Sequence, residues 1–232
     1  MQSLTPKFIK YGSIAVACGT DKDLPALLSA APADFLQATI PFTNTAAAQL
    51  LCQNGFYFAD RFVTATINVK RSTYALARSR FALTCGTAQP QQMLPLAKEA
   101  FVTDRRFHLQ RHYNPQLAGI ILQSYLETAY TQNWPVFYCT YKEELAGFLV
   151  LQTDENGAYV YLAAAAPKYQ GSGAAIELYA AALDYCRTQG IGRMWGRIST
   201  ANTAVANLYA MLGASFGLPE DVYLCQTAPQ QF

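Results

Sequence analysis

Apolar residues in the carboxyl-terminal third of the chain switch between the period of a strand and the period of a helix. The run 159–164 alternates as a strand does, and after Ala174 apolar side chains return on one helical face for about fifteen residues. A second strand, 193–198, leads into a helix whose apolar positions are Val205, Leu208, Tyr209 and Leu212. The pattern therefore predicts two consecutive strand-helix units, and a glycine follows each helix.

A glycine turn, Gly171-Ser172-Gly173, joins the first of these strands to its helix. A helix that starts at such a turn has unpaired backbone N–H groups at the positive end of its dipole, and glycine lets phosphate oxygens approach them. We therefore expect a phosphate site here, although a tight turn without a ligand has the same pattern. Ile176 replaces the third glycine of the dinucleotide fingerprint and no Gly-Lys-Ser/Thr is present, which disfavours nucleotide hydrolysis.

These segments resemble two motifs of the GNAT acyltransferase superfamily. The motif Gln/Arg-x-x-Gly-x-Gly/Ala corresponds to 168–173, and the motif of an asparagine, a short helix and Leu-Tyr-x-x-x-Gly-Phe corresponds to 202–214. Lys168 replaces the usual Gln or Arg, and Ala214 replaces the usual aromatic residue. The order of predicted elements over 81–226 also matches this family. The resemblance implies an α/β (α+β) GNAT fold, with a mixed central sheet whose strands splay and which helices flank.

The resemblance also implies acetyl-CoA as co-substrate and a role for particular residues. Tyr209 would protonate the departing thiolate, since its ordinary pKa of about 10 lies near that of a thiol. Asn202 would bind the pantetheine amide or help to place Tyr209. The alternative for Tyr209 is that it only packs on the apolar face of its helix. The glycine turn would bind the pyrophosphate, and pantetheine would run beside the small strand residues. The implied cofactor-binding residues are Leu162, Ala163, Ala164, Gln170, Gly171, Ser172, Gly173, Ala174 and Asn202.

The amino-terminal part of the chain repeats the carboxyl-terminal part. Residues 40–58 align without gaps on 198–216 at a constant offset of 158 positions, as between Asn44 and Asn202. Leu51 stands where the second copy has Tyr209, and no glycine turn precedes the first copy. We interpret 1–76 as a partial, degenerate GNAT-like domain that serves as a scaffold or substrate wall. Residues 77–232 would then be the catalytic GNAT acetyltransferase domain, whereas two unrelated capped helices that end in glycine are the alternative.

Within the superfamily the chain is most similar to the dTDP-fucosamine (dTDP-4-amino-sugar) acetyltransferases. The matches are the pairs 100–101 and 106–107 and the closing segment 222–224. This similarity implies direct attack by a primary amine, with a nucleotide-linked amino sugar as the acceptor. A protein amino terminus, a lysine or an antibiotic amine stays open as the acceptor. A non-catalytic acyl-CoA sensor is the alternative from another functional class.

A basic segment supplies the candidate acceptor residues. Its arginines could bind a nucleotide diphosphate through charge-assisted hydrogen bonds, or it could be a solvated loop. Its two histidines are candidates for a general base because histidine titrates near neutral pH. The arginines are Arg105, Arg106 and Arg111, and the histidines are His108 and His112.

Composition narrows the possible partners. The net charge is +2 and lysines and arginines form no long run, so we expect neither a nucleic-acid partner nor a membrane partner. The six cysteines are scattered without a Cys-x-x-Cys pair, and we expect no metal. No apolar run approaches the roughly 20 residues of a membrane helix, and the start of the chain lacks a signal core. We expect a cytoplasmic protein, and a homodimer stays open.

Overall fold

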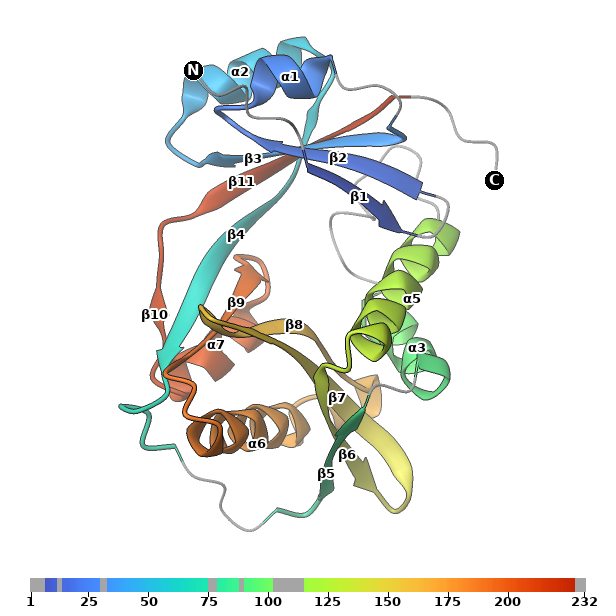
Figure 1. The fold of residues 1–232 in the computed structure, drawn as a ribbon, viewed down its shortest axis with the longest axis vertical. Helices are drawn as coiled ribbons and strands as arrows, with labels where there is room; N and C mark the ends of the chain where they lie inside the picture. Colours follow the sequence, from blue (N-terminus) through green and yellow to red (C-terminus); the bar gives the residue numbers. More distant parts are fainter. Residues whose placement is uncertain are drawn as a thin grey trace.

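A single twisted sheet of 11 strands runs through the part of the chain that the computed structural model describes, which is residues 7–11, 14–29, 33–74, 79–87, 90–101 and 115–227 (Figure 1). The strand order is β1-β2-β3-β11-β4-β9-β8-β7-β6-β5, and the short β10 pairs with β4. The strands are β1 (Lys7–Tyr11), β2 (Ile14–Thr20), β3 (Phe35–Pro41), β4 (Tyr57–Asn68), β5 (Ala82–Thr87), β6 (Pro135–Tyr141), β7 (Glu144–Asp154), β8 (Gly157–Ala165), β9 (Arg193–Ser199), β10 (Ser215–Phe216) and β11 (Glu220–Gln226).

Helices cover both faces of this sheet, which confirms the mixed α/β fold predicted from the sequence. They are α1 (Leu24–Leu28), α2 (Thr45–Gln53), α3 (Pro90–Ala100), α5 (Pro115–Thr131), α6 (Ala174–Thr188) and α7 (Thr203–Met211), with a 3₁₀ turn η1 (Pro167–Tyr169). Strand β4 is the longest strand of this sheet, because its first half pairs with β11 and its second half with β9.

The repeat seen in the sequence is also present in the secondary structure. At the offset of 158 positions β3 falls on β9, α2 falls on α7, and β4 spans β10 and β11. The helix ends agree in detail as well. The amide oxygen of Asn44 accepts a hydrogen bond from Ala47 N at 3.1 Å, and that of Asn202 accepts one from Val205 N at 3.1 Å. The glycine that follows each helix has a φ angle near +80°, at Gly55 and its equivalent in the second copy.

The two copies exchange their last strands. Strand β4 of the first copy pairs with β9 of the second, and β11 of the second pairs with β3 of the first. The two registers are equivalent at the same offset, as the pairs Phe62↔Ser199 and Glu220↔Pro41 illustrate. The division into 1–76 and 77–232 stays a prediction, and the sheet runs continuously across it.

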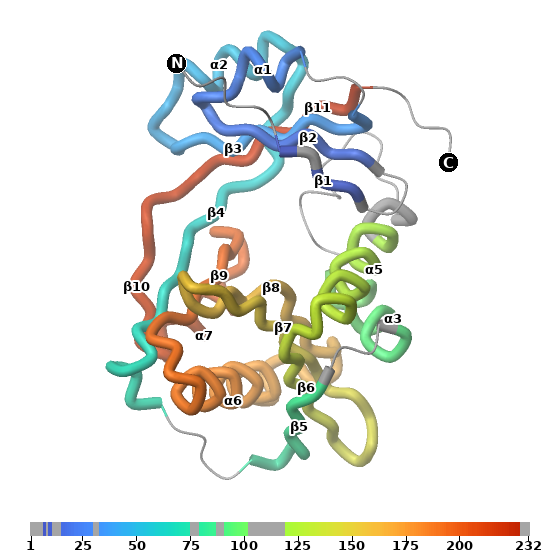
Figure 2. The backbone as a smooth tube through the Cα atoms, viewed as in Figure 1, coloured from blue at the N-terminus to red at the C-terminus, as the bar shows by residue number. Residues whose placement is uncertain are grey.

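Helix α5 connects the two halves on the face opposite α6. Leu126 packs in a cluster with Val150 of β7, while Ile121, five residues earlier, packs with Val16 of β2 and Phe35 of β3. The neighbouring side chains of those two strands instead join the cluster under α1 and α2, since strand residues alternate between faces. Figure 2 follows α5 from the lower half of the molecule toward β1. Both halves therefore contribute to the face of the sheet that α5 covers.

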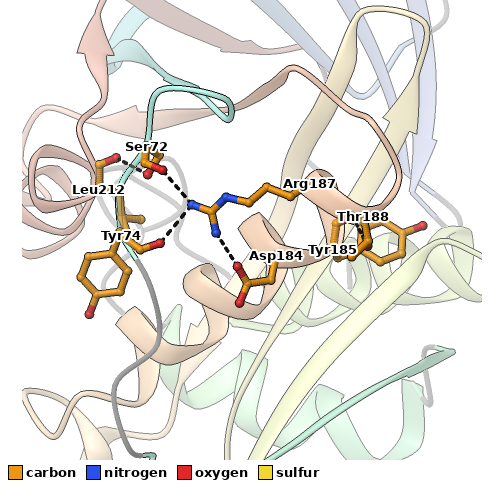
Figure 3. Close-up of polar contacts among 7 residues, drawn as sticks. All are labelled: Ser72, Tyr74, Asp184, Tyr185, Arg187, Thr188 and Leu212. Carbon is orange, nitrogen blue, oxygen red and sulfur yellow. Dashed lines mark hydrogen bonds and ion pairs between the residues drawn. The ribbon is translucent and has the colours of Figure 1, made fainter.

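Arg187, near the end of α6, holds the segment that follows β4 (Figure 3). Its Nη2 donates hydrogen bonds to the carbonyl oxygens of Ser72 at 2.9 Å and Tyr74 at 3.0 Å. Its Nη1 pairs with Asp184, and Ser72 Oγ donates to the carbonyl oxygen of Leu212 at 3.2 Å. The chain is thus fixed to α6 and to the end of α7 as it leaves the first half.

Candidate functional site

Strands β8 and β9 separate shortly after they meet. Their parallel ladder consists of two pairs, Ala158↔Met194 and Tyr159↔Trp195. Beyond them β8 continues to pair with β7, and β9 continues to pair with β4. Within the described ranges, the backbone of β8 from Val160 onward therefore has no strand partner on its β9 side. The predicted cofactor-binding strand residues lie on this separated segment; they are Leu162, Ala163 and Ala164.

The glycine turn lies at the amino end of α6, as expected. Gly171 and Gly173 have φ angles of +71° and +98°, and Gly173 is the N-cap residue. The N–H groups of Gln170 and Ser172 donate to carbonyl oxygens of η1, at 3.2 Å and 3.1 Å. Those of Gly171, Gly173 and Ala174 have no partner among the described residues. Three N–H groups at the positive end of a helix dipole form an arrangement that can bind an anion.

Two cationic side chains flank this turn. Arg80, which precedes β5, donates a hydrogen bond to the carbonyl oxygen of Ser172. Lys168 pairs with Glu144 at 2.5 Å, and the hydroxyl of Tyr169 donates to the same carboxylate at 2.8 Å. Hydrogen bonds from both residues lower the pKa of Glu144, and the one from Lys168 has the larger effect. No sequence pattern pointed to Arg80, because 92 positions separate it from the residue of the turn that it contacts.

Tyr209 is buried, with 1% of its surface exposed, and its hydroxyl lies against Gly196. A Cβ atom at Gly196 would overlap Tyr209 Oη and would lie 3.2 Å from Tyr209 Cζ and 3.6 Å from Val160 Cβ. Val160 and Gly196 each follow the last β8–β9 pair by one residue. The phenol of Tyr209 is therefore placed where the two strands separate. Gly196 was not predicted as a site residue, since a glycine inside a strand belongs to none of the motifs considered.

The environment of Tyr209 keeps its hydroxyl protonated at neutral pH. Burial raises the pKa of Tyr209 well above its ordinary value, and the neighbouring Tyr179 and Tyr159 raise it further. The ring of Tyr179 on α6 lies edge to face with that of Tyr209, with centroids 5.3 Å apart and an interplanar angle of 81°. A hydrogen bond with Tyr179 is among the causes that raise the pKa of Tyr209. Burial raises the pKa of Tyr179 to about 12. The site thus contains a neutral phenol that can donate a proton.

Asn202 caps the helix that carries Tyr209. Its amide oxygen accepts from Val205 N, so it fixes the first turn of α7. Because Asn44 caps α2 in the same way, capping alone accounts for an asparagine at both positions of the repeat. Binding of the pantetheine amide by Asn202 stays a prediction.

A polar cluster lies where β4, β9 and β11 meet. Arg197 Nη2 is 3.1 Å from Glu220 Oε2, and its guanidinium lies 5.3 Å from the centroid of the Phe62 ring. Asp60 is buried and accepts a hydrogen bond from Ser199 Oγ at 3.0 Å. Alternation along β9 places Arg197 and Ser199 on the same face as Trp195, opposite the face that Tyr209 covers. None of these residues was predicted from the sequence to belong to a site.

The predicted acceptor-binding arginines and the candidate general bases lie outside the described residues. They are Arg105, Arg106 and Arg111, and His108 and His112. Within the described ranges, no group of three or more His, Cys, Asp or Glu side chains is placed to hold a metal ion. In the same ranges, no helix is both long enough and apolar enough to cross a bilayer.

Comparison with known proteins gives a family and a set of similar folds. The model of the acetyltransferase (GNAT) family matches residues 98–214, about half of the 232 residues. No curated protein matches the chain. A conserved protein of unknown function from Staphylococcus epidermidis has a TM-score of 0.65 and 11% identity, over 94% of this chain and 87% of that one.

Two further solved structures are described as GNAT proteins. A putative GNAT acetyltransferase from Novosphingobium aromaticivorans has a TM-score of 0.58 and 13% identity, over 94% of this chain and 89% of that one. A tandem GNAT protein from the clavulanic acid biosynthesis pathway has a TM-score of 0.57 and 13% identity, over 85% of this chain and 65% of that one. At such identities the likeness concerns the fold.

Proposed function

This chain belongs to the GNAT family of acetyltransferases, and on that premise we propose that it transfers an acetyl group from acetyl-CoA to a primary amine of a small molecule. The amine attacks directly in a ternary complex. One observation carries the proposal: a buried, protonated Tyr209 has its hydroxyl where β8 and β9 separate, on the same α6 face as the unpaired N–H groups of the glycine turn. A proton donor and an anion site thus adjoin one opening in the sheet.

Acetyl-CoA supplies the thioester when it is bound. The N–H groups of Gly171, Gly173 and Ala174 hold its pyrophosphate, and the free backbone edge of β8 orients its pantetheine arm. As the C–N bond forms and the C–S bond breaks, Tyr209 gives its proton to the departing sulfur. The amine loses its proton to water, and water restores the proton of Tyr209. Burial keeps Tyr209 protonated until that step.

For the acceptor we propose a nucleotide-linked amino sugar. The support is the similarity to dTDP-amino-sugar acetyltransferases together with three arginines, Arg105, Arg106 and Arg111. We also propose that the amino-terminal half forms one wall of the acceptor site. Its strand β4 lies beside β9, and α5 packs on both halves over the same face of the sheet.

The test is a CoA-release assay with acetyl-CoA and a panel of dTDP-amino-sugars, peptides and polyamines. Wild-type protein is compared with Tyr209→Phe and with Tyr223→Phe, a control that removes the hydroxyl of a buried tyrosine on β11. We expect turnover with the sugar nucleotides, a loss of about a hundredfold or more in Tyr209→Phe, and unchanged CoA binding by calorimetry.

The other outcomes are distinct. Release with peptides or polyamines alone would retain the acetyltransferase and reject the sugar. Equal turnover by wild type and Tyr209→Phe would remove Tyr209 from the mechanism. CoA binding without release from any amine would favour the acyl-CoA sensor.

A further inference from the structure

Two tyrosines from different helices meet in the interior of the catalytic half. Tyr179 lies on α6 and Tyr209 on α7, and 5% and 1% of their surfaces are exposed. Their rings meet edge to face with centroids 5.3 Å apart. A hydrogen bond between them raises the pKa of Tyr209 and lowers that of Tyr179, which is the effect expected when the Tyr209 hydroxyl donates to the Tyr179 oxygen. Leu51 stands at the position of Tyr209 in the amino-terminal copy, so the pair belongs to the second half alone.

Apart from Tyr179, the groups around the Tyr209 hydroxyl would stabilise a negative charge on its oxygen only weakly. Gly196 and Val160 are its neighbours on the sheet, and both tyrosines belong to a cluster of buried apolar residues. The titratable groups that act on Tyr209 are Tyr179 on α6 and Tyr159 on β8. If Tyr209 gives up its proton, a phenolate oxygen is left in an apolar environment, which is costly unless that oxygen is hydrogen-bonded.

The placement of Tyr179 also connects it to the anion site. Helix α6 begins at Ala174, directly after the glycine turn, and it carries Tyr179 in its second turn. The helix whose amino end offers the unpaired N–H groups therefore also supplies the hydrogen-bond partner of Tyr209. The binding of the pyrophosphate and the orientation of the Tyr209 hydroxyl would then both depend on α6.

We propose that Tyr179 is a positioning residue for acetyl transfer, which holds the Tyr209 hydroxyl at the separation of β8 and β9 and donates a hydrogen bond to the oxygen when Tyr209 ionises. This inference rests on the proposed function. In the step concerned, the proton of Tyr209 moves to the sulfur of CoA while the C–S bond breaks. The hydroxyl proton of Tyr179 stays on Tyr179 and turns toward the Tyr209 oxygen. A hydrogen bond to an ionised oxygen is stronger than one to a neutral oxygen, so Tyr179 stabilises the transition state more than the ground state.

The test measures steady-state kinetics of Tyr179→Phe, Tyr209→Phe and the double variant, with the best acceptor from the amine panel. We expect kcat of Tyr179→Phe to fall about tenfold, the effect of one charge-assisted hydrogen bond on a barrier. Both KM values should stay within about twofold, because Tyr179 touches neither substrate in this proposal. The double variant should be no slower than Tyr209→Phe, because Tyr179 acts through Tyr209.

The matched control is Tyr185→Phe, which removes a hydroxyl from the next turns of α6, where the ring packs against Phe137 instead of Tyr209. It should leave kcat unchanged. Thermal unfolding separates stability from catalysis: Tyr179→Phe leaves a buried hydroxyl of Tyr209 without its partner and should lower Tm, and the double variant should recover part of that loss.

An unchanged kcat in Tyr179→Phe, with a large loss in Tyr209→Phe, would overturn this inference and leave the proposed function intact. A further loss in the double variant beyond Tyr209→Phe would also overturn it, since Tyr179 would then act independently. Unchanged kcat in Tyr209→Phe would instead refute the proposed acid, and the inference with it.

Discussion

Replacement of Gly196 by alanine tests whether the Tyr209 hydroxyl occupies the separation of β8 and β9. The new Cβ would overlap Tyr209 Oη and would lie 3.2 Å from Tyr209 Cζ, closer than an ordinary van der Waals contact. Both groups are buried in a packed core, so the ring has to tilt away. Overpacking of this kind costs about 1–3 kcal/mol in the free energy of unfolding. A displacement of about 1 Å in a catalytic group lowers the rate about a hundredfold.

Urea unfolding and the CoA-release assay measure these two effects. The matched control is Gly192→Ala, because a Cβ there meets no atom within 4 Å and its φ is not positive. The decisive comparison is Gly196→Ala in the Tyr209→Phe background, which lacks the overlapped oxygen. We expect the destabilisation there to be less than half of that in the wild-type background. Equal destabilisation in the two backgrounds would refute the contact between Gly196 and the Tyr209 hydroxyl.

Two further predictions compare a candidate site residue with a control residue in the same backbone environment. Asn202→Ala and Asn44→Ala each remove one helix cap and should each cost about 1 kcal/mol in urea unfolding. Only Asn202→Ala should also change the kinetics of CoA release, and equal kinetic effects would place both caps in a purely structural role. Gly171→Ala and Gly190→Ala both force alanine into a positive φ, at +71° and +70°, which costs about 1–2 kcal/mol. Calorimetry should show weaker CoA binding for Gly171→Ala alone, and equal binding by both variants would argue against a phosphate site at the turn.

The sequence predicted those parts of the fold that local patterns specify. The second strand-helix unit was expected at 193–198 and around Leu208, and the structure has β9 at Arg193–Ser199 and α7 at Thr203–Met211. Periodicity, an N-cap asparagine and a closing glycine are all local signals, so they identify these elements without knowledge of their neighbours. The repeat was found for the same reason, since the two copies carry the same caps.

Contacts between distant segments carried no such signal. The apolar face of the helix after Ala174 was predicted, but the contact of its Tyr179 with Tyr209 depends on how α6 and α7 cross. Gly196 looked like an ordinary residue of a strand until the Tyr209 ring was found against it. Asp60 of β4 and Arg197 of β9 lie in one polar cluster because the two strands pair, and that pairing joins segments far apart in the sequence.

The exchange of strands explains why a repeat found in the sequence does not establish which strands pair. A constant offset identifies which elements are equivalent. Strands β4 and β11 could each stay in their own half or be exchanged between the halves, and the offset is the same in both arrangements. In the exchanged arrangement Ala65 and Ile67 of the first copy lie in the core beneath α6 and α7, while Tyr223 of the second copy lies in the core beneath α2. Each half therefore completes the hydrophobic core of the other. The amino-terminal half contributes a strand to the sheet that holds Tyr209, although it has neither the glycine turn nor the tyrosine itself.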